Sequence, residues 1–291
     1  MLYTSYLGEH PFAKDPAVEK FNGKYFLYYS IMVRDVLGIG IATSDDLETW
    51  TEVGQVPRTQ QCEMTGIGAP AAMVREGVLH LFYQTYGTGV QDAICHAWSY
   101  DGLHFIKDET NPVYRPTDDW CCGRAIDADI CRLGDRYFLY IATRDHDFRI
   151  QKIGVAWTPA DSDFSRGSWI QACRRAVVAP EMGWEQSCIE APACVEQDGK
   201  IYMFYGGAYN RSPQQIGCAV SADGVSFEKL SSQPLIPNGK PGSWNAEESG
   251  HPYAFRDEDG QVYLFYQGYD GNTWRISRAR VTFQDGMPVI G

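Results

Sequence analysis

Three carboxylic acids and one histidine open corresponding stretches of a repeated sequence unit. Asp15, Asp127, Glu190 and His251 each precede a short run, a glycine-containing turn and an aromatic segment. The residue type at this place changes from copy to copy, whereas a purely structural repeat would carry the same residue each time. Carboxyl groups that converge in different surroundings can act as a general base, a general acid and a group that adjusts them. That combination performs glycoside hydrolysis.

A competing interpretation is that these acids only cap turns, as Asp45, Asp101 and Asp223 are expected to do. Three carboxylates on inward-facing strand ends would repel one another and lose hydration on burial. Because the fold gains nothing from such an arrangement, we favour a functional role for the three acids.

The aromatic segments show the repeat most clearly. Each is followed by an apolar run, an Asp-Gly turn or its equivalent, and another short run. Apolar runs joined by such turns predict antiparallel β-hairpins. We find no convincing amphipathic helix of ten or more residues. The five aromatic segments are residues 25–29, 79–83, 137–140, 202–205 and 263–266.

Five units of four short strands predict an all-β fold, a five-bladed β-propeller that forms one domain over residues 1–291. One four-stranded sheet cannot bury both of its faces, so neighbouring blades must pack on each other. A β-sandwich with a similar number of strands is the alternative, but the recurrence of the whole unit favours the propeller. The first strand of each blade lines a propeller axis, so the residues that open the units should meet at one funnel.

The composition excludes several partners. The formal net charge of −12 makes nucleic acid or an anionic membrane surface a poor partner, and no run approaches the ~18 apolar residues of a membrane span. The nine cysteines include no C-x-x-C pair, and the first residues lack the pattern of a signal peptide. We therefore expect a cytoplasmic protein with free thiols, and a carbohydrate as the partner. The oligomeric state stays open.

The motifs Lys14-Asp15-Pro16, Ile126-Asp127-Ala128 and Ile189-Glu190-Ala191-Pro192 resemble the signature of glycoside hydrolase family 43, a family of five-bladed propellers. The resemblance extends over all five units. It implies that Asp15 is the general base, that Asp127 orients the acid and adjusts its pKa, and that Glu190 is the general acid of an inverting single displacement.

The same resemblance implies further site residues. His251 would help to hold a central calcium or water cluster, Arg275 would contact the sugar, and the chemistry itself would need no cofactor. The chain departs from the family pattern at Ala128, where proline is usual, and at Gly68, where many members carry an aromatic residue that helps to form the sugar subsite.

Three more residues are candidates for substrate binding. Trp120 and Trp274 stand in irregular stretches near inner strands, and either could stack on a sugar ring. Packing between blades is the alternative for both. Arg144 follows the aromatic segment of the third unit and could reach the funnel, and an exposed loop is the alternative.

The leading hypothesis is an inverting glycosidase that releases a terminal pentose, arabinofuranose or xylose. The alternatives are a retaining fructan- or sucrose-cleaving enzyme, a glycoside phosphorylase and a non-catalytic carbohydrate-binding propeller. Ala17 and Ala191 replace the Asn and Cys that the retaining fructan group typically carries, which disfavours that group. A phosphorylase would need several basic residues around the funnel.

Overall fold

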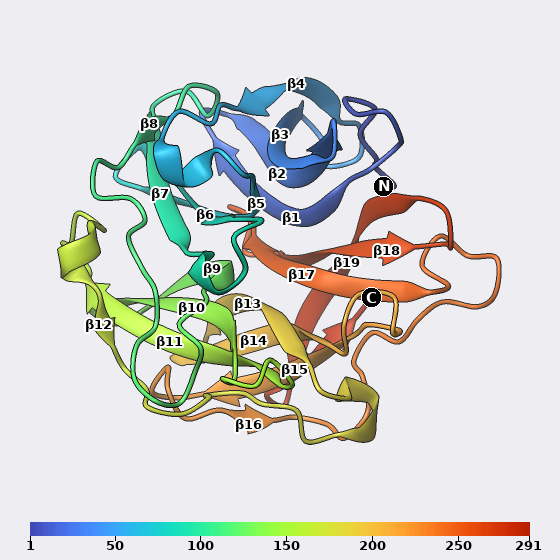
Figure 1. Cartoon of the computed structure of the whole chain (residues 1–291). Coiled ribbons are helices and arrows are strands. Elements are labelled where there is room, and N and C mark those ends of the chain that lie inside the picture. The colour runs from blue at the N-terminus through green and yellow to red at the C-terminus, as the bar shows by residue number, and fades with distance from the viewer.

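The computed structural model describes residues 1–291 and contains five antiparallel sheets of four strands each. The sheets follow one another around a common axis, with the chain running from the blue first blade to the red fifth blade (Figure 1). The first strands of neighbouring blades contact each other around the ring, including those of the first and last blades. The predicted five-bladed propeller is therefore confirmed.

The strands follow the same order in every blade, from the axis outwards. Blade one contains β1 (Lys14–Phe21), β2 (Lys24–Val33), β3 (Val36–Ser44) and β4 (Thr51–Val56); blade two contains β5 (Ile67–Arg75), β6 (Val78–Thr85), β7 (Ile94–Ser99) and β8 (Ile106–Lys107); blade three contains β9 (Ile126–Leu133), β10 (Arg136–Arg144), β11 (Gln151–Pro159) and β12 (Ile170–Gln171); blade four contains β13 (Ile189–Gln197), β14 (Lys200–Gly207), β15 (Gln215–Ser221) and β16 (Glu228–Lys229); blade five contains β17 (Glu248–Arg256), β18 (Val262–Tyr269), β19 (Trp274–Gln284) and β20 (Met287–Ile290).

The helical content is limited to four 3₁₀ turns of three residues, at Gln61–Glu63, Gly89–Gln91, Arg166–Ser168 and Gly183–Glu185. None of these is long or apolar enough to cross a membrane.

The first residues of the chain tie the two ends of the ring together. Tyr3 exchanges both backbone hydrogen bonds with Ile276 of β19, each at 2.8 Å. The Tyr3 hydroxyl donates to the hydroxyl of Tyr29 in β2 at 2.7 Å. Blade five is thereby joined to blade one immediately before the chain enters β1, which carries Asp15.

The aromatic second strands hold neighbouring blades together. The hydroxyl of Tyr28 donates to the carbonyl of Gly102 at 2.9 Å, and that of Tyr140 donates to the carbonyl of Gly224 at 2.8 Å. Both acceptors lie in the Asp-Gly turn of the next blade. Both glycines have positive φ, and a Cβ atom at Gly102 would lie 2.6 Å from the ring of Phe26. These turns therefore need glycine for packing between blades as well as for the turn itself.

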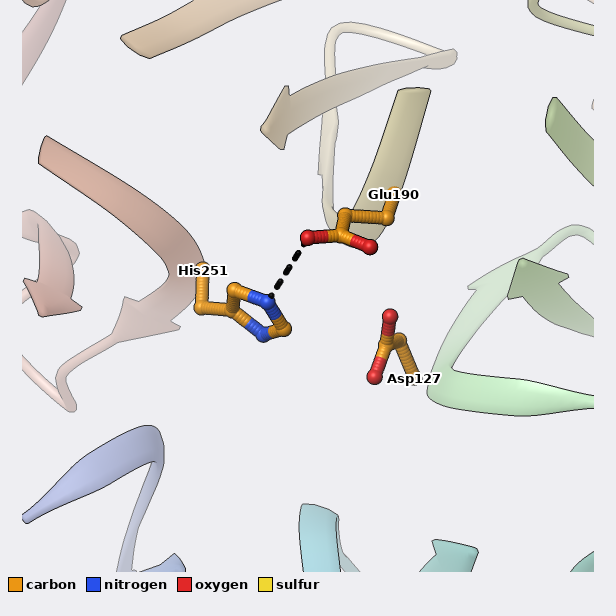
Figure 2. Close-up of side chains that lie close together, drawn as sticks. All are labelled: Asp127, Glu190 and His251. Carbon is orange, nitrogen blue, oxygen red and sulfur yellow. Dashed lines mark hydrogen bonds and ion pairs between the residues drawn. The ribbon is translucent and has the colours of Figure 1, made fainter. Parts of the chain in front are cut away.

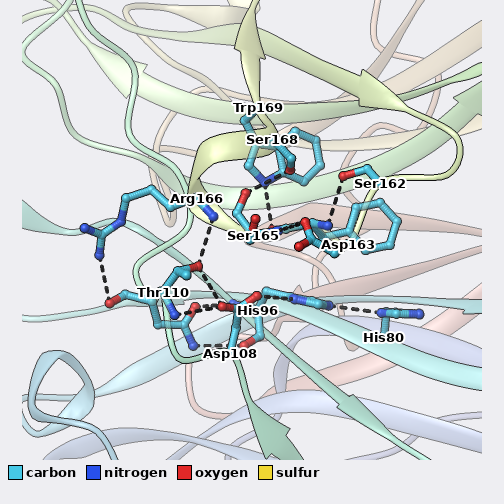
Figure 3. A network of polar contacts seen from close by, with 12 residues as sticks. His80, His96, Asp108, Thr110, Ser162, Asp163, Ser165, Arg166, Ser168 and Trp169 are labelled. Carbon is cyan, nitrogen blue, oxygen red and sulfur yellow. Dashed lines mark hydrogen bonds and ion pairs between the residues drawn. The ribbon is translucent and has the colours of Figure 1, made fainter.

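A buried polar network joins blades two and three (Figure 3). His80 Nδ1 lies 3.0 Å from His96 Nε2, and His96 Nδ1 lies 3.1 Å from a carboxylate oxygen of Asp108. Asp108 accepts from Thr110, whose hydroxyl accepts the backbone N–H of Arg166 in blade three. Burial lowers the pKa of His80 to about 3, so the histidine pair stays neutral and is structural.

A buried ion pair with a tyrosine occurs twice on the outer side of the ring. Lys107 Nζ lies 2.7 Å from the carboxylate of Glu63, which also accepts the hydroxyl of Tyr83 at 2.6 Å. The same arrangement recurs in blade four with Glu185, Tyr205 and Lys229. Each glutamate lies in a 3₁₀ turn that leads into a first strand, so the pair fixes the entry of the chain to β5 and to β13.

We predict that Lys107→Met lowers the free energy of unfolding by about 3–5 kcal/mol, because it leaves the fully buried Glu63 carboxylate without its cation. The matched control is Lys24→Met, which removes an exposed ion pair with Asp45. That loss should stay below about 1 kcal/mol. Urea denaturation of the two variants measures both values. Equal losses of unfolding free energy in the two variants would show that the Lys107–Glu63 pair does not fix the entry of the chain to β5.

Candidate active site

A β-bulge interrupts the first strand of every blade near the axis. The pairing with the second strand shifts its register at this point in all five sheets. In each bulge one residue other than glycine has φ between 40° and 50°. Such backbone costs on the order of 1–3 kcal/mol per residue and is concentrated at functional sites. The five bulge residues are Asp15, Ala69, Asp127, Ala191 and His251.

The fourth blade is offset from this pattern by one residue. Its bulge residue is Ala191, so Glu190 corresponds to Lys14 of blade one and not to Asp15. The equivalent positions are those of Pro16 and Pro192, and Glu190 lies one residue further from its proline than Asp15 does. A bulge places two residues of one strand opposite one residue of its partner. For this reason Lys14 and Asp15 both face the cavity, and Glu190 reaches it from the earlier position.

A cavity of about 320 Å³ lies at one end of the axis, above the bulges. It brings together Asp15, Asp127, Glu190 and His251. Of the predicted substrate-binding residues it is lined by Arg144 and Trp274. The remaining lining residues are Phe12, Lys14, Met32, Leu37, Gln84, Tyr86, Arg124, Ile126, Gln151, Tyr209 and Asn210.

Two predicted substrate-binding residues do not line this cavity. The ring of Trp120 packs over Gly154 of β11, where a Cβ atom would lie 2.5 Å from it, so Trp120 takes the packing role. Arg275 follows Trp274 on β19, and successive strand residues point to opposite faces. The guanidinium of Arg275 pairs with Asp270.

His251 lies between the proposed base and the proposed acid. Its Nδ1 is 2.9 Å from a carboxylate oxygen of Asp15. Its Nε2 is 3.2 Å from Oε1 of Glu190, the contact drawn in Figure 2. Burial would lower the pKa of His251, but the neighbouring carboxylates, Asp15 foremost, raise it well above 6.5. The imidazole is therefore a cation, and both of its nitrogens face carboxylates.

The three carboxyl groups differ in their protonation. Burial opposes ionisation of Asp15, but the charges of His251 and Lys14 hold the pKa of Asp15 below its usual range. Burial also raises the pKa of Glu190, but His251 and Gln214 together lower it. For Asp127, burial raises the pKa to about 7, and the charges of Glu190 and Asp15 add to that effect.

Asp127 and Glu190 titrate as a pair. Their ligand atoms and those of His251 lie within 4.8 Å of one another, and Figure 2 shows the Asp127 carboxyl group beside that of Glu190. Two interacting carboxyl groups at this range lose their protons in steps that belong to the pair. Below about pH 7 the pair therefore holds one proton, which resides mainly on Asp127 while Glu190 accepts hydrogen bonds.

Four donors surround the Glu190 carboxylate. Gln214 Nε2 donates to Oε1 at 2.6 Å, Asn210 Nδ2 lies 3.3 Å from the same oxygen, and His251 contacts it as well. Gln151 Nε2 donates to Oε2. These contacts fix the orientation of Glu190 and stabilise its ionised form.

Side chains of the preceding blade hold the bulge residues that carry the chemistry. Gln267 of β18 accepts the backbone N–H of Asp15 at 3.0 Å, and Gln84 of β6 accepts that of Asp127 at 2.6 Å. Gln214, between β14 and β15, accepts the N–H of His251 at 3.2 Å. Each glutamine therefore satisfies a donor that the bulge leaves without a partner strand.

The sequence interpretation missed these glutamines. The sequence does contain a signal for Gln84 and Gln267, because each directly follows the tyrosine that ends an aromatic segment, at residues 83–84 and 266–267. Gln151, Gln214 and Asn210 gave no such signal, since they lie outside the repeated motif.

The residues around His251 fit a calcium ion poorly. Calcium takes six to eight oxygen ligands. Asp127, Glu190 and His251 offer one ligand atom each within 4.8 Å of one another, and the imidazole is a cation engaged by two carboxylates. An ion here would need most of its ligands from water. The calcium stays a prediction, and no step of the reaction is derived through it.

A five-bladed propeller with two aspartates and one glutamate around one end of its axis has the parts of a glycoside-cleaving enzyme. Comparison with known proteins agrees with this class. The chain belongs to family 43 of the glycosyl hydrolases, whose family model matches residues 10–288. This family membership supports glycosidase activity on a carbohydrate substrate.

The solved structures that resemble the chain share its fold over almost its entire length. A thermostable family-43 glycoside hydrolase has a TM-score of 0.77 and 21% identity, over 99% of this chain and 95% of that one. An alpha-L-arabinofuranosidase from Lactobacillus brevis has a TM-score of 0.73 and 18% identity, over 96% of this chain and 94% of that one. Identities this low establish the fold alone.

One curated relative is similar over a shorter segment. A beta-1,2-mannobiose phosphorylase from Thermoanaerobacter sp. (strain X514) is 24% identical over 120 residues. The match covers 37% of this chain and 38% of the length of that enzyme.

We predict that Gln267→Ala lowers kcat by about two orders of magnitude with little change in KM, because the Asp15 bulge loses its acceptor and the carboxylate shifts. Steady-state kinetics and a thermal melt of the same preparation measure both effects. The matched control is Gln261→Ala, which removes only hydrogen bonds to the backbone carbonyls of Val262 and Val281. Comparable kcat losses in the two variants would contradict a positioning role for Gln267.

Proposed function

We propose that the protein is an inverting glycosidase that releases a terminal pentose, arabinofuranose or xylose. The observation that carries the proposal is the imidazolium of His251 between Asp15 and Glu190. A ring and two polar contacts separate the two carboxylates. An imidazole between the two carboxyl groups supports the wider separation of inverting enzymes, roughly 6.5–9.5 Å, over the roughly 5–5.5 Å of retaining enzymes.

In this mechanism Asp15, ionised through the charges of His251 and Lys14, takes a proton from the water that attacks the anomeric carbon. Glu190 delivers the proton of the Asp127–Glu190 pair to the departing oxygen. Asp127 holds that proton in the resting enzyme, which supports its role as the group that adjusts the acid. Gln267 and Gln84, from the preceding blades, fix the bulges at Asp15 and Asp127. This holds both aspartates in position relative to Glu190.

The size of the cavity supports the release of a terminal sugar. Its volume of about 320 Å³ lies at the small end of the range for small-molecule sites. Such a cavity suits one or two sugar rings better than an extended chain. The fold likeness to an arabinofuranosidase is consistent with a pentose but does not establish one.

Phosphorolysis is a second candidate. Lys14, Arg124 and Arg144 line the cavity, which supplies the basic residues that a phosphorylase needs to hold phosphate. The partial likeness to a mannobiose phosphorylase points the same way. Formation of a sugar phosphate in phosphate buffer would distinguish this reaction from hydrolysis.

A panel of aryl glycosides with good and poor leaving groups tests the hydrolase. We expect Glu190→Gln to lose about 10²–10⁴-fold in kcat on poor leaving groups and much less on 4-nitrophenyl glycosides, which need little acid assistance. Asp15→Asn should lose activity on both. Glu228→Gln, an exposed change on the outer strand β16, serves as the control. If the wild type turns over no aryl glycoside of any sugar, the proposed activity fails.

A further inference from the structure

Two cations in the cavity lining have no carboxylate partner. Lys14 Nζ donates to Asn210 Oδ1 at 3.0 Å and lies 4.5 Å from the ring centre of Trp274. Arg144 Nε donates to Gln151 Oε1 at 2.7 Å, and its guanidinium lies 5.1 Å from the ring centre of Tyr209. The third cation, Arg124, differs because it pairs with the buried Asp92 at 3.0 Å.

The catalytic carboxylates account for Lys14 in part, because its charge helps to keep Asp15 ionised, but they contact Arg144 at no point. His251 contacts both Asp15 and Glu190, and the remaining acid, Asp127, shares its proton with Glu190. Lys14 therefore serves the Asp15 carboxylate together with His251, whereas Arg144 adds a positive charge that no catalytic carboxylate contacts. This stands out in a chain whose formal net charge is −12.

Both cations are linked to Glu190 through the amide group of a neighbouring side chain. Asn210 links Lys14 to Glu190, because its amide oxygen accepts from the lysine and its amide nitrogen lies 3.3 Å from the carboxylate. Gln151 links Arg144 to Glu190 in the same way. Under the proposed function Glu190 protonates the leaving oxygen, so the two cations flank the leaving group.

We infer that Lys14 and Arg144 bind a carboxylate on the leaving group, so that the preferred substrate is a sugar attached to a uronic acid residue. This inference rests on the proposed function. A guanidinium presents paired N–H groups that match a carboxylate, and an ammonium adds a point charge. Tyr209, which lies against Arg144 in the cavity lining, offers an aromatic surface for the ring that carries the carboxylate.

Inorganic phosphate is the other oxyanion that these cations could bind. In an inverting phosphorolysis a phosphate oxygen bonds to the anomeric carbon while the glycosidic C–O bond breaks, and the leaving oxygen takes the proton from Glu190. The phosphate must then approach from the face opposite the leaving group, which is the Asp15 side. Because Arg144 is linked to Glu190, its position favours a leaving-group carboxylate over an attacking phosphate.

The test compares two disaccharides that differ only in the reducing-end sugar, glucuronate in one and glucose in the other. The glycone is the sugar that the aryl glycoside panel identifies. We expect wild-type kcat/KM to favour the glucuronate compound by about tenfold or more. The preference should fall to within about twofold in Lys14→Met and in Arg144→Gln. It should also weaken as salt is added.

The control is Arg149→Gln, an exposed change in the same β10–β11 connection, which should keep the preference. Turnover of the neutral 4-nitrophenyl glycoside by Arg144→Gln and Arg149→Gln shows that the catalytic groups are intact. Lys14→Met also removes a charge that keeps Asp15 ionised, so this variant is judged by the ratio of its kcat/KM values on the two disaccharides, in which a loss common to both cancels. Hydrolysis of that glycoside without any preference for glucuronate overturns this inference and leaves the proposed function standing. A sugar phosphate formed in millimolar phosphate also overturns it. If the wild type hydrolyses neither probe, both proposals fail.

Discussion

The site depends on one buried cation, the imidazolium of His251, which lies between two carboxylates at the axis of the propeller. Without that charge, Asp15, Asp127 and Glu190 would be three acids in one cavity, and their mutual repulsion and lost hydration would raise the pKa of each. With it, Asp15 and Glu190 are ionised and the site proton resides mainly on Asp127. The acid and base roles therefore follow from the position of a histidine that does not itself react in the proposed mechanism.

The propeller supplies this arrangement through its fivefold repetition. Each blade brings one bulge to the axis, and a side chain from the preceding blade accepts the N–H of the bulge at Asp15, Asp127 and His251. The catalytic residues are thus held by strands of different blades, and the ring must close for Gln267 to reach Asp15. The pairing of Tyr3 with Ile276 and its contact with Tyr29 support that closure.

Much of the fold could be predicted from the sequence because the aromatic strands recur with their turns. The convergence of Asp15, Asp127, Glu190 and His251 also followed from the repeat, since first strands line an axis. The one-residue offset of Glu190 is visible in the sequence, because Glu190 lies two residues before Pro192 and Asp15 only one before Pro16. Its consequence is not visible, because a bulge changes which face of the strand a residue occupies. Because side chains alternate along β19, Trp274 lines the cavity and Arg275 does not. The sequence does not show which of these two neighbours faces the cavity.

The cavity lining shows a second limit of sequence reasoning. Lys14 and Arg144 come from different blades, and their shared relation to Glu190 depends on Asn210 and Gln151, which occupy no repeated position. The sequence allows Trp120 to stack on a sugar or to pack between blades, and its contact with Gly154 assigns it to packing. Lys14 and Arg144 reach Glu190 only through an intervening amide side chain, and such an indirect contact produces no regular spacing in a sequence.

The most direct test of the account is an NMR titration of the ¹⁵N-labelled imidazole of His251, assigned by its loss in His251→Asn. Because the carboxylates raise the pKa of His251 well above 6.5, both ring nitrogens should stay protonated as the pH rises through and beyond 6.5. In Asp15→Asn the same ring should lose its proton at lower pH, since the largest of the stabilising charges is gone. A wild-type His251 that titrates near pH 6.5, or that is neutral throughout, would contradict the central role assigned to its charge.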